Sequence, residues 1–252
     1  MIIFQTPMSK PEIHYLESCT STNRLLLEAL KNGEELPDGY TVYTSYQSRG
    51  YGQVGNSWES EGGKNLLFSL LIHPTQVHAL EQFFISEAIA LAIAEYLDTE
   101  TDDISVKWPN DIYWSEKKIC GILIENNLRG AYLKDCVIGA GLNLNQEEFK
   151  SNAPNPVSLK NITGNTYSIE DALQQILTNF FTLLELGYTD KNTLHTRYIE
   201  RLFRYGAPAR YMDEKGHFIG RITDVEPDGH LHIKDSDGYE RRYAFKEVSY
   251  IL

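Results

Sequence analysis

The chain has 252 residues, enough for one large domain or for a main domain with a small second one. Hydrophobic residues make up 42% and charged residues 23%, which is typical of a globular protein with a substantial core. Acidic residues outnumber basic ones by 35 to 23, and the net charge of −12 argues against wrapping nucleic acid or coating an anionic membrane. This balance still allows a local basic pocket for phosphate.

The sequence carries no sign of a membrane or export segment. The longest apolar stretches, Leu66–Ile72 and Ala88–Ala94, fall well short of the ~20 residues that cross a bilayer. The first four residues have no basic region and no long apolar core, so we expect no signal peptide. The three cysteines form no C-x-x-C pair, which disfavours a disulfide framework or a cysteine-rich zinc site. We therefore expect a cytoplasmic protein.

The first hundred residues alternate predicted strands and helices. Capping side chains at Ser18–Asn23 precede a helical pattern at 24–32, and Gly33 follows where a helix C-terminus is expected. The other predicted elements here are strands at 13–17, 41–45 and 66–72 and a long helix at 78–97.

The predicted secondary structure changes near residue 205, from mixed strands and helices to short strands alone. Before it we predict strands at 104–108, 112–114, 119–126 and 131–140, a loop at 151–165, and helices at 169–186 and 194–205. After it come short strands at 209–212, 217–225, 230–235 and 239–245, separated by Lys-Gly and Asp-Gly turns. The pattern predicts a mixed α/β domain at 1–204 and a small antiparallel β domain at 205–252.

A glycine-rich segment at 46–58 is the first candidate for chemistry. Its glycines, Gly50, Gly52 and Gly55, let backbone N–H groups approach and enclose a small or anionic ligand. No Gly-Lys-Ser/Thr follows, so the segment is not a Walker loop, and no helix follows directly, so it is not a dinucleotide fingerprint. A plain surface connection is an equally good interpretation of this segment taken alone.

The second candidate is the run Lys107–Asp111 with Lys118 and Gly121 after it. Pro109 ends a strand and puts Asn110 and Asp111 at its tip, where oxygen atoms can hold a hydrated divalent cation. A hairpin would bring the Lys118 ammonium towards that tip. A cation, an acid–amide pair and a lysine suit adenylyl chemistry, in which negative charge must be neutralised at a phosphate. Spacing alone favours a solvated hairpin with a surface lysine.

Smaller signals are weaker. Gly139, Gly141 and Asn143 end an apolar strand, so the glycines could admit a flat ring and the amide could read its polar edge; a plain strand exit fits as well. His230 and His232 share a strand face at metal-compatible spacing, but no third ligand is evident, and solvated histidines are the better interpretation. Serine hydrolase and zinc protease motifs are absent.

Taken together, these stretches resemble the biotin–protein ligase family. They occur in the family's order and approximate spacing over residues 13–252. The Lys-Trp-Pro-Asn-Asp run followed by Lys-x-x-Gly-Ile is the most specific part. The stretches that match are Ser21-Thr22-Asn23, Gln47 with the glycine-rich segment and Trp58, Lys107–Asp111, Lys118-x-x-Gly121, and Gly139-x-Gly141-x-Asn143.

The resemblance implies an ATP-dependent enzyme that makes biotinyl-5′-AMP and passes the biotinyl group to one lysine of a biotin carboxyl carrier protein or domain. It implies ATP and Mg²⁺ as cofactors, a class II synthetase-like catalytic domain, a C-terminal SH3-like β-barrel, and no DNA or membrane partner; a homodimer is compatible with it. It assigns catalysis to Lys118 and Lys107 and the metal to Asp111 and Asn110. The implied biotin-binding residues are Ser21, Thr22, Asn23, Gln47, Gly50, Tyr51, Gly52, Gln53, Lys118 and Gly121, and the implied ATP-binding residues are Arg49, Trp58, Asn110 and Asn143.

Two departures and two rivals qualify the resemblance. The chain has Tyr51 where the family usually has arginine, and Arg49 could substitute for it. Only about twelve residues precede the first strand, so we expect the type without a helix-turn-helix DNA-binding domain. A lipoate–protein ligase shares the chemistry, but its Arg-Arg-x-Ser-Gly-Gly-Gly loop is absent. A non-catalytic binding module would not need Lys107, Asn110, Asp111 and Lys118 together.

Overall fold

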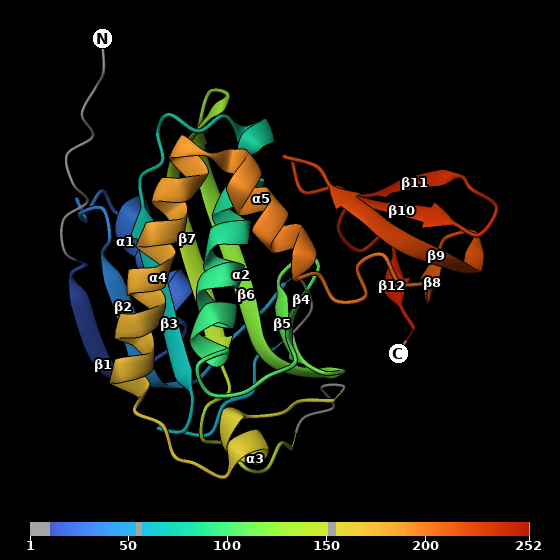
Figure 1. The fold of residues 1–252 in the computed structure, drawn as a ribbon. Coiled ribbons are helices and arrows are strands. Elements are labelled where there is room, and N and C mark those ends of the chain that lie inside the picture. The colour runs from blue at the N-terminus through green and yellow to red at the C-terminus, as the bar shows by residue number, and fades with distance from the viewer. Residues whose placement is uncertain (1–10, 54–56, 151–154, 252) are drawn as a thin grey trace. The chain divides into compact units, whose positions relative to one another are not determined.

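The structure is a computed structural model that describes residues 11–53, 57–150 and 155–251 (Figure 1). Its internal contacts group the chain into two compact units. Unit 1 comprises residues 1–78 and 119–177, and unit 2 comprises residues 79–118 and 178–252. These bounds differ from the predicted division after residue 204. That division concerns independent folding and stays a prediction.

Unit 1 is built on a mixed sheet whose strands lie in the order β1-β2-β3-β7-β6. β1 pairs with β2 in parallel, and the other neighbours pair antiparallel. This arrangement confirms the predicted α/β class with a mixed sheet. The strands are β1 (Ile13–Cys19), β2 (Thr41–Gln47), β3 (Leu66–Ile72), β6 (Lys117–Arg129, of which residues from 119 on lie in this unit) and β7 (Tyr132–Leu142).

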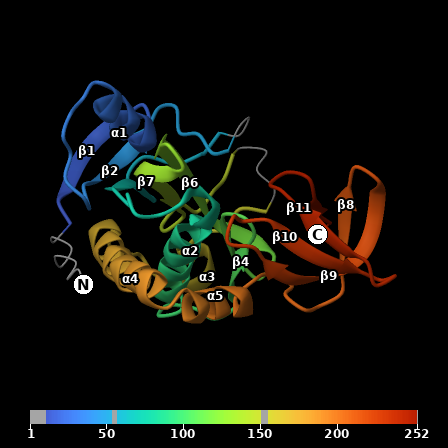
Figure 2. The ribbon, with the colours of Figure 1, turned by 90° about the horizontal axis from the view of Figure 1, so that it is seen from above.

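Helices cover both sides of this sheet. α1 (Thr22–Lys31) packs against β2, β3 and β7 through a core of Leu26, Val42, Leu71 and Val137. Figure 2 shows α1 on one side of these strands and α4 (Ile169–Thr189) on the other. All seven residues of β3 are buried, as the apolar run predicted. The short helix α3 (Leu159–Thr163) lies inside the predicted loop, begins with a capping box at Ser158 and ends at Gly164.

Unit 2 combines helices with antiparallel strands. α2 (Phe83–Leu97) is buried nearly all round, since almost every residue is apolar, and it is preceded by a 3-10 turn, η1 (Ala79–Glu81). α5 (Lys191–Glu200) packs against α2. A hairpin of β4 (Ile104–Lys107) and β5 (Asp111–Trp114) pairs Lys107 with Asp111 across a turn that contains a cis Trp108–Pro109 bond.

The C-terminal strands of unit 2 form a five-stranded antiparallel sheet in the order β11-β10-β9-β8-β12, coloured orange to red in Figure 1. It confirms the predicted antiparallel C-terminal region and adds a short last strand. The strands are β8 (Ala209–Asp213), β9 (Gly216–Val225), β10 (Leu231–Asp235), β11 (Glu240–Tyr243) and β12 (Ser249–Tyr250). No helix in the described part of the chain is long and apolar enough to cross a membrane.

Candidate active site

The start of α1 places three predicted ligand-binding residues in the interior of unit 1. Ser21 is the helix N-cap, and its Oγ accepts a hydrogen bond from Arg24 N at 3.5 Å. Ser21, Thr22 and Asn23 are each at most 4% exposed. Three adjacent polar side chains therefore enter the core together, which requires partners for each of them.

Gln47, at the end of β2, is one of these partners. Its Oε1 accepts hydrogen bonds from the backbone N of Thr22 at 2.7 Å and from Thr22 Oγ1 at 3.2 Å. The parallel pairing of β1 and β2 brings Gln47 beside Cys19, just before the helix cap. The structure thus joins two predicted ligand-binding stretches that lie 25 residues apart in sequence.

Ser69 and Glu125 extend this network, and sequence reasoning missed both. Ser69 is 0% exposed in the middle of β3; its Oγ donates to Asn23 Oδ1 at 2.5 Å and lies 2.7 Å from Thr22 Oγ1. Asn23 Nδ2 donates to Glu125 Oε2 at 2.9 Å and to Leu123 O at 3.2 Å. Ser69 had a sequence signal, since it is the one polar residue in an otherwise apolar strand. We name the group Thr22, Asn23, Gln47, Ser69 and Glu125 the polar network.

Close packing explains two glycines of the Gly139-x-Gly141 stretch. A Cβ on Gly139 would lie 2.1 Å from Asn23 Oδ1, so the Asn23 amide needs a bare backbone beside it. A Cβ on Gly141 would lie 2.5 Å from the indole nitrogen of Trp58. The flat ring that Gly141 admits is therefore a side chain of the protein itself. Gly121, on β6, pairs with Gly141 on β7.

Asn143 follows β7 and is 3% exposed. Its Nδ2 donates to Val157 O at 3.1 Å, and its backbone N donates to Ile119 O at 2.9 Å. The side-chain oxygen is buried, and no hydrogen-bond partner for it is found among the described residues. A buried amide oxygen in this state is suited to accept a hydrogen bond from a ligand.

The glycine-rich segment continues after Gln47. Arg49 is exposed, and its backbone N donates to Thr20 O at 2.9 Å, while Trp58 N donates to Gly50 O at 3.0 Å. Gly52 and Gln53 are half-buried and end the first described part of the segment. Residues 54–56, including Gly55, lie outside the described residues.

Tyr51 lies in this segment where the resemblance expected arginine. Its hydroxyl donates to Glu125 Oε2 at 2.8 Å, and the Arg24 guanidinium lies 5.5 Å from the centre of its ring. Burial, together with the hydrogen bond to Glu125, raises the pKa of Tyr51 to about 12, so the phenol remains a hydrogen-bond donor at neutral pH. The structure thus brings the Arg24 guanidinium to Tyr51.

Four predicted residues lie in unit 2, on and beside the β4–β5 hairpin. Lys118 Nζ forms an ion pair with Asp111 Oδ1 at 2.6 Å. The predicted hairpin therefore brings Lys118 to the strand tip, as expected. Asn110 is in the turn between the two strands. Lys107 Nζ instead donates to Tyr113 Oη at 2.9 Å and lies 5.1 Å from the ring centre of Tyr250.

Lys107 is therefore held among aromatic rings. Burial lowers the pKa of its ammonium, and the neighbouring Asp111 carboxylate opposes that effect. The residue contacts β12 through Tyr250, which is half-buried.

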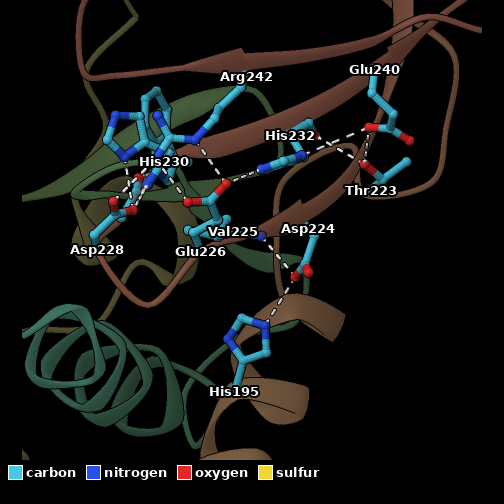
Figure 3. A network of polar contacts seen from close by, with 12 residues as sticks. His195, Thr223, Asp224, Val225, Glu226, Asp228, His230, His232, Glu240 and Arg242 are labelled. Carbon is cyan, nitrogen blue, oxygen red and sulfur yellow. Dashed lines mark hydrogen bonds and ion pairs between the residues drawn. The ribbon is translucent and has the colours of Figure 1, made fainter. Parts of the chain in front are cut away.

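A second polar cluster lies on the C-terminal sheet (Figure 3). Among the described residues, Glu226, Asp228 and His230 are close enough together to share a metal ion. Arg242 donates to both Glu226 oxygens at 2.8 Å and reaches Asp228 Oδ2 at 3.1 Å. Hydrogen bonds from Arg242 and His232 lower the pKa of Glu226 to about 2. Because the Arg242 guanidinium already binds both carboxylates, we interpret this cluster as an ion-pair network rather than a cation site.

The two histidines predicted as solvated are in fact paired with carboxylates. His230 Nδ1 lies 2.8 Å from Asp228 Oδ1, and His232 Nε2 lies 2.5 Å from Glu226 Oε1. Both ring contacts stay on the C-terminal sheet.

The fold and the polar network define a mixed-sheet α/β protein with a largely buried set of hydrogen-bonded polar groups in unit 1. Residues 15–143 match the biotin/lipoate A/B protein ligase family, which is just over half of the chain. The chain belongs to this family.

Relatives and solved structures agree with this assignment. The chain is 27% identical to the bifunctional ligase/repressor BirA of Bacillus subtilis, over 95% of the chain and 74% of that protein. It is 29% identical to the biotin–[acetyl-CoA-carboxylase] ligase of Paracoccus denitrificans, over 84% and 90% of the two chains. The biotin protein ligase of Aquifex aeolicus, solved with biotin and ATP, superposes with a TM-score of 0.78 at 23% identity, over 94% of this chain and 97% of the other. The fold is that of biotin protein ligases, as predicted.

Proposed function

We propose that this protein is a biotin–protein ligase. Biotin's carboxylate oxygen attacks the α-phosphorus of ATP, pyrophosphate leaves, and biotinyl-5′-AMP forms. The ε-amine of a carrier lysine then attacks the acyl carbon and loses a proton, and AMP leaves with the carboxyl oxygen. The observation that carries the proposal is the buried network that fixes Thr22, Asn23 and Gln47 in a chain of this family.

In this proposal the head group of biotin binds beside the N-terminus of α1 and the glycine-rich segment. Its set comprises Ser21, Thr22, Asn23, Gln47, Gly50, Tyr51, Gly52, Gln53 and Gly121. Trp58 and Asn143 meet the adenine, with the buried Asn143 oxygen as acceptor, and Arg49 serves ATP from the surface.

Lys118 supplies the positive charge of the first step. An ammonium has three N–H donors, so Lys118 can bind a carboxylate or phosphate oxygen while it keeps its ion pair with Asp111. A preorganised charge of this kind acts most strongly on the negative charge that builds up at the phosphate in the transition state. Lys107, whose ammonium donates to Tyr113 Oη, supplies a second positive charge for the same step.

Asp111 and Asn110 are the residues we assign to Mg²⁺. One carboxylate and one amide are fewer oxygen ligands than Mg²⁺ takes, but magnesium sites commonly draw their remaining ligands from water and nucleotide phosphates. The donor set therefore fits a nucleotide-bound magnesium ion, which would neutralise phosphate charge when bound.

The carrier partner in this proposal is the biotin carboxyl carrier protein or domain of a biotin-dependent carboxylase, in the cytoplasm. The name of the Paracoccus relative supports a carboxylase as the acceptor. The net charge of −12 supports a ligase that binds neither DNA nor an anionic membrane. A homodimer remains compatible with the proposal.

ATP–pyrophosphate exchange tests the substrate directly. We expect exchange that depends on biotin and Mg²⁺, with no stimulation by lipoate or octanoate. Exchange with lipoate but not biotin would identify a lipoate–protein ligase, which the same family contains. No exchange with any of the three acids would favour a binding module.

A further inference from the structure

Glu125 joins two parts of unit 1 that are distant in sequence. It lies on β6, and its side chain is half-buried. A single oxygen, Oε2, accepts from Tyr51 Oη at 2.8 Å and from Asn23 Nδ2 at 2.9 Å. The first turn of α1 and the glycine-rich segment are thus hydrogen-bonded to one carboxylate atom.

Both ends of the Asn23 side-chain amide have protein partners. Its two N–H donors go to Glu125 and Leu123 O, and its oxygen accepts from Ser69. The bare backbone at Gly139 leaves space only for this amide, since a Cβ there would lie 2.1 Å from Asn23 Oδ1. Asn23 therefore acts by being fixed, and Glu125 supplies the charged acceptor that fixes one side of it.

Tyr51 is held from two directions. Glu125 accepts from its hydroxyl, and the Arg24 guanidinium lies over its ring. Tyr51 thereby contacts both the Arg24 guanidinium on α1 and the Glu125 carboxylate on β6. It does so at the position of the glycine-rich segment where the resemblance implied an arginine. Arg24, Tyr51 and Glu125 are all exposed or half-buried, so the contact is close to solvent and to an entering ligand.

We propose that Glu125 is a positioning residue for biotin binding, which acts by holding Asn23 and Tyr51 in one arrangement. The inference rests on the proposed function, and it adds to that function a residue that does not itself meet the reacting atoms. It predicts an effect on biotin binding rather than on the chemical step, because Glu125 bonds Asn23 and Tyr51, which the proposed function assigns to biotin.

The test compares Glu125→Ala with Glu125→Gln in biotin-dependent pyrophosphate exchange. Glu125→Ala removes both acceptor bonds, and we expect the KM for biotin to rise about tenfold to a hundredfold with kcat within about threefold of the wild type. Glu125→Gln should recover most of the affinity, because both donors use one oxygen and an amide oxygen can replace it. If Glu125 had only a structural role, Glu125→Ala would lower kcat, raise KM and lower the melting temperature together. Glu125→Gln would then not restore the KM for biotin.

A double-mutant cycle tests whether Tyr51 acts through Glu125. Tyr51→Phe should raise the KM for biotin by itself, but should add little in the Glu125→Ala background, because the hydroxyl has then already lost its acceptor. Tyr15→Phe is the matched control: it removes a hydroxyl that bonds Ser45 Oγ at 2.8 Å on the same sheet, and it should leave the KM for biotin unchanged.

The outcomes separate this inference from the proposed function. An active wild type whose KM for biotin is unaffected by Glu125→Ala, or equally impaired by Glu125→Ala and Glu125→Gln, overturns the inference alone. Full additivity of Tyr51→Phe and Glu125→Ala would remove Tyr51 from it. A wild type without exchange for any acid would count against the proposed function itself.

Discussion

Buried polar residues of unit 1 satisfy one another before any ligand arrives. Thr22, Asn23 and Ser69 are each at most 4% exposed, and each has partners at hydrogen-bond distance. An unpaired polar group in the core costs about 1–3 kcal/mol, so such a set is retained only when it is nearly complete. In the proposed function this network is preorganised, so biotin binding need not bear the cost of ordering these side chains.

Gly139 offers a sharp test at the residue scale. In Gly139→Ala the new Cβ would lie 2.1 Å from Asn23 Oδ1, so the amide must move. We expect a loss of about 1–3 kcal/mol in the free energy of unfolding, and weaker biotin binding. Urea denaturation and calorimetric titration with biotin measure the two effects.

Gly62→Ala is the control for this substitution, because a Cβ at Gly62 meets nothing within 4 Å and the residue is exposed. It should change neither quantity. Equal stability of the two alanine variants would contradict the packing account of Gly139.

Lys118 carries the second prediction at this scale. Lys118→Ala should lower the rate of adenylate formation by ~10²–10³ while biotin still binds, because the lost charge acts mainly on the transition state. Lys118→Arg should recover little, since a planar fork does not replace a point charge paired with Asp111. Single-turnover formation of biotinyl-5′-AMP measures the rate, and near-normal adenylation in Lys118→Ala would remove Lys118 from the mechanism.

At the scale of elements, His195 ties three parts of unit 2 together. His195 lies on α5, and its Nδ1 lies 2.7 Å from Glu87 Oε1 on α2. Its Nε2 lies 3.0 Å from Asp224 Oδ1 on β9 (Figure 3). Glu87 is only 3% exposed, so this ion pair also satisfies a buried carboxylate. Both ring nitrogens can donate only when the imidazole is protonated.

The stability of unit 2 should therefore depend on pH. The hydrogen bond to Glu87, opposed by burial, raises the pKa of His195 from 6.5 to about 9. A raised folded-state pKa stabilises the fold fully below about pH 6.5 and loses that contribution as pH rises through about 9. Solvent screening of a side chain that is 34% exposed keeps the loss to about 1–2 kcal/mol.

Thermal unfolding between pH 6 and pH 10 checks this prediction. His195→Gln should remove most of the fall above pH 7. His14 serves for comparison, because its ring pairs with the exposed Glu12, and His14→Gln should leave the profile unchanged. A wild-type melting temperature that is flat up to pH 9.5 would contradict the role of His195.

At the scale of the whole molecule, residues 205–208 form an exposed connection into the C-terminal sheet. The sheet also contacts earlier parts of unit 2, since Trp108 Nε1 donates to Gly229 O at 2.9 Å and Phe83 N donates to Pro227 O at 3.2 Å. Covalent separation at this connection would therefore leave non-covalent contacts in place.

Limited proteolysis tests this expectation. Cleavage after Tyr205 should give a stable fragment that ends near the predicted boundary at 204. The two fragments should separate on a denaturing gel but elute together in size-exclusion chromatography at pH 7, and should come apart more readily above pH 9 as His195 loses its proton. Independent elution at pH 7 would mean that the C-terminal sheet is held by the chain alone.

Local signals in the sequence were sufficient for most elements. Apolar periodicity predicted α2 and β3, capping residues predicted the start of α1, and Asp-Gly turns predicted the C-terminal strands, because each pattern acts over a few neighbouring residues. The helix at 159–163 and the last strand at 249–250 were missed; they are short, and tertiary contacts rather than periodicity stabilise them.

The sequence by itself determined the family resemblance, the α/β class and the polar stretches available for a site. The tertiary structure decided which of these residues meet. Ser69 and Glu125 join Asn23 from positions 46 and 102 residues away in sequence, and the Arg24 guanidinium reaches Tyr51. No local pattern contains such pairings, since they depend on the register of β3, β6 and β7 and on the close approach that Gly139 allows.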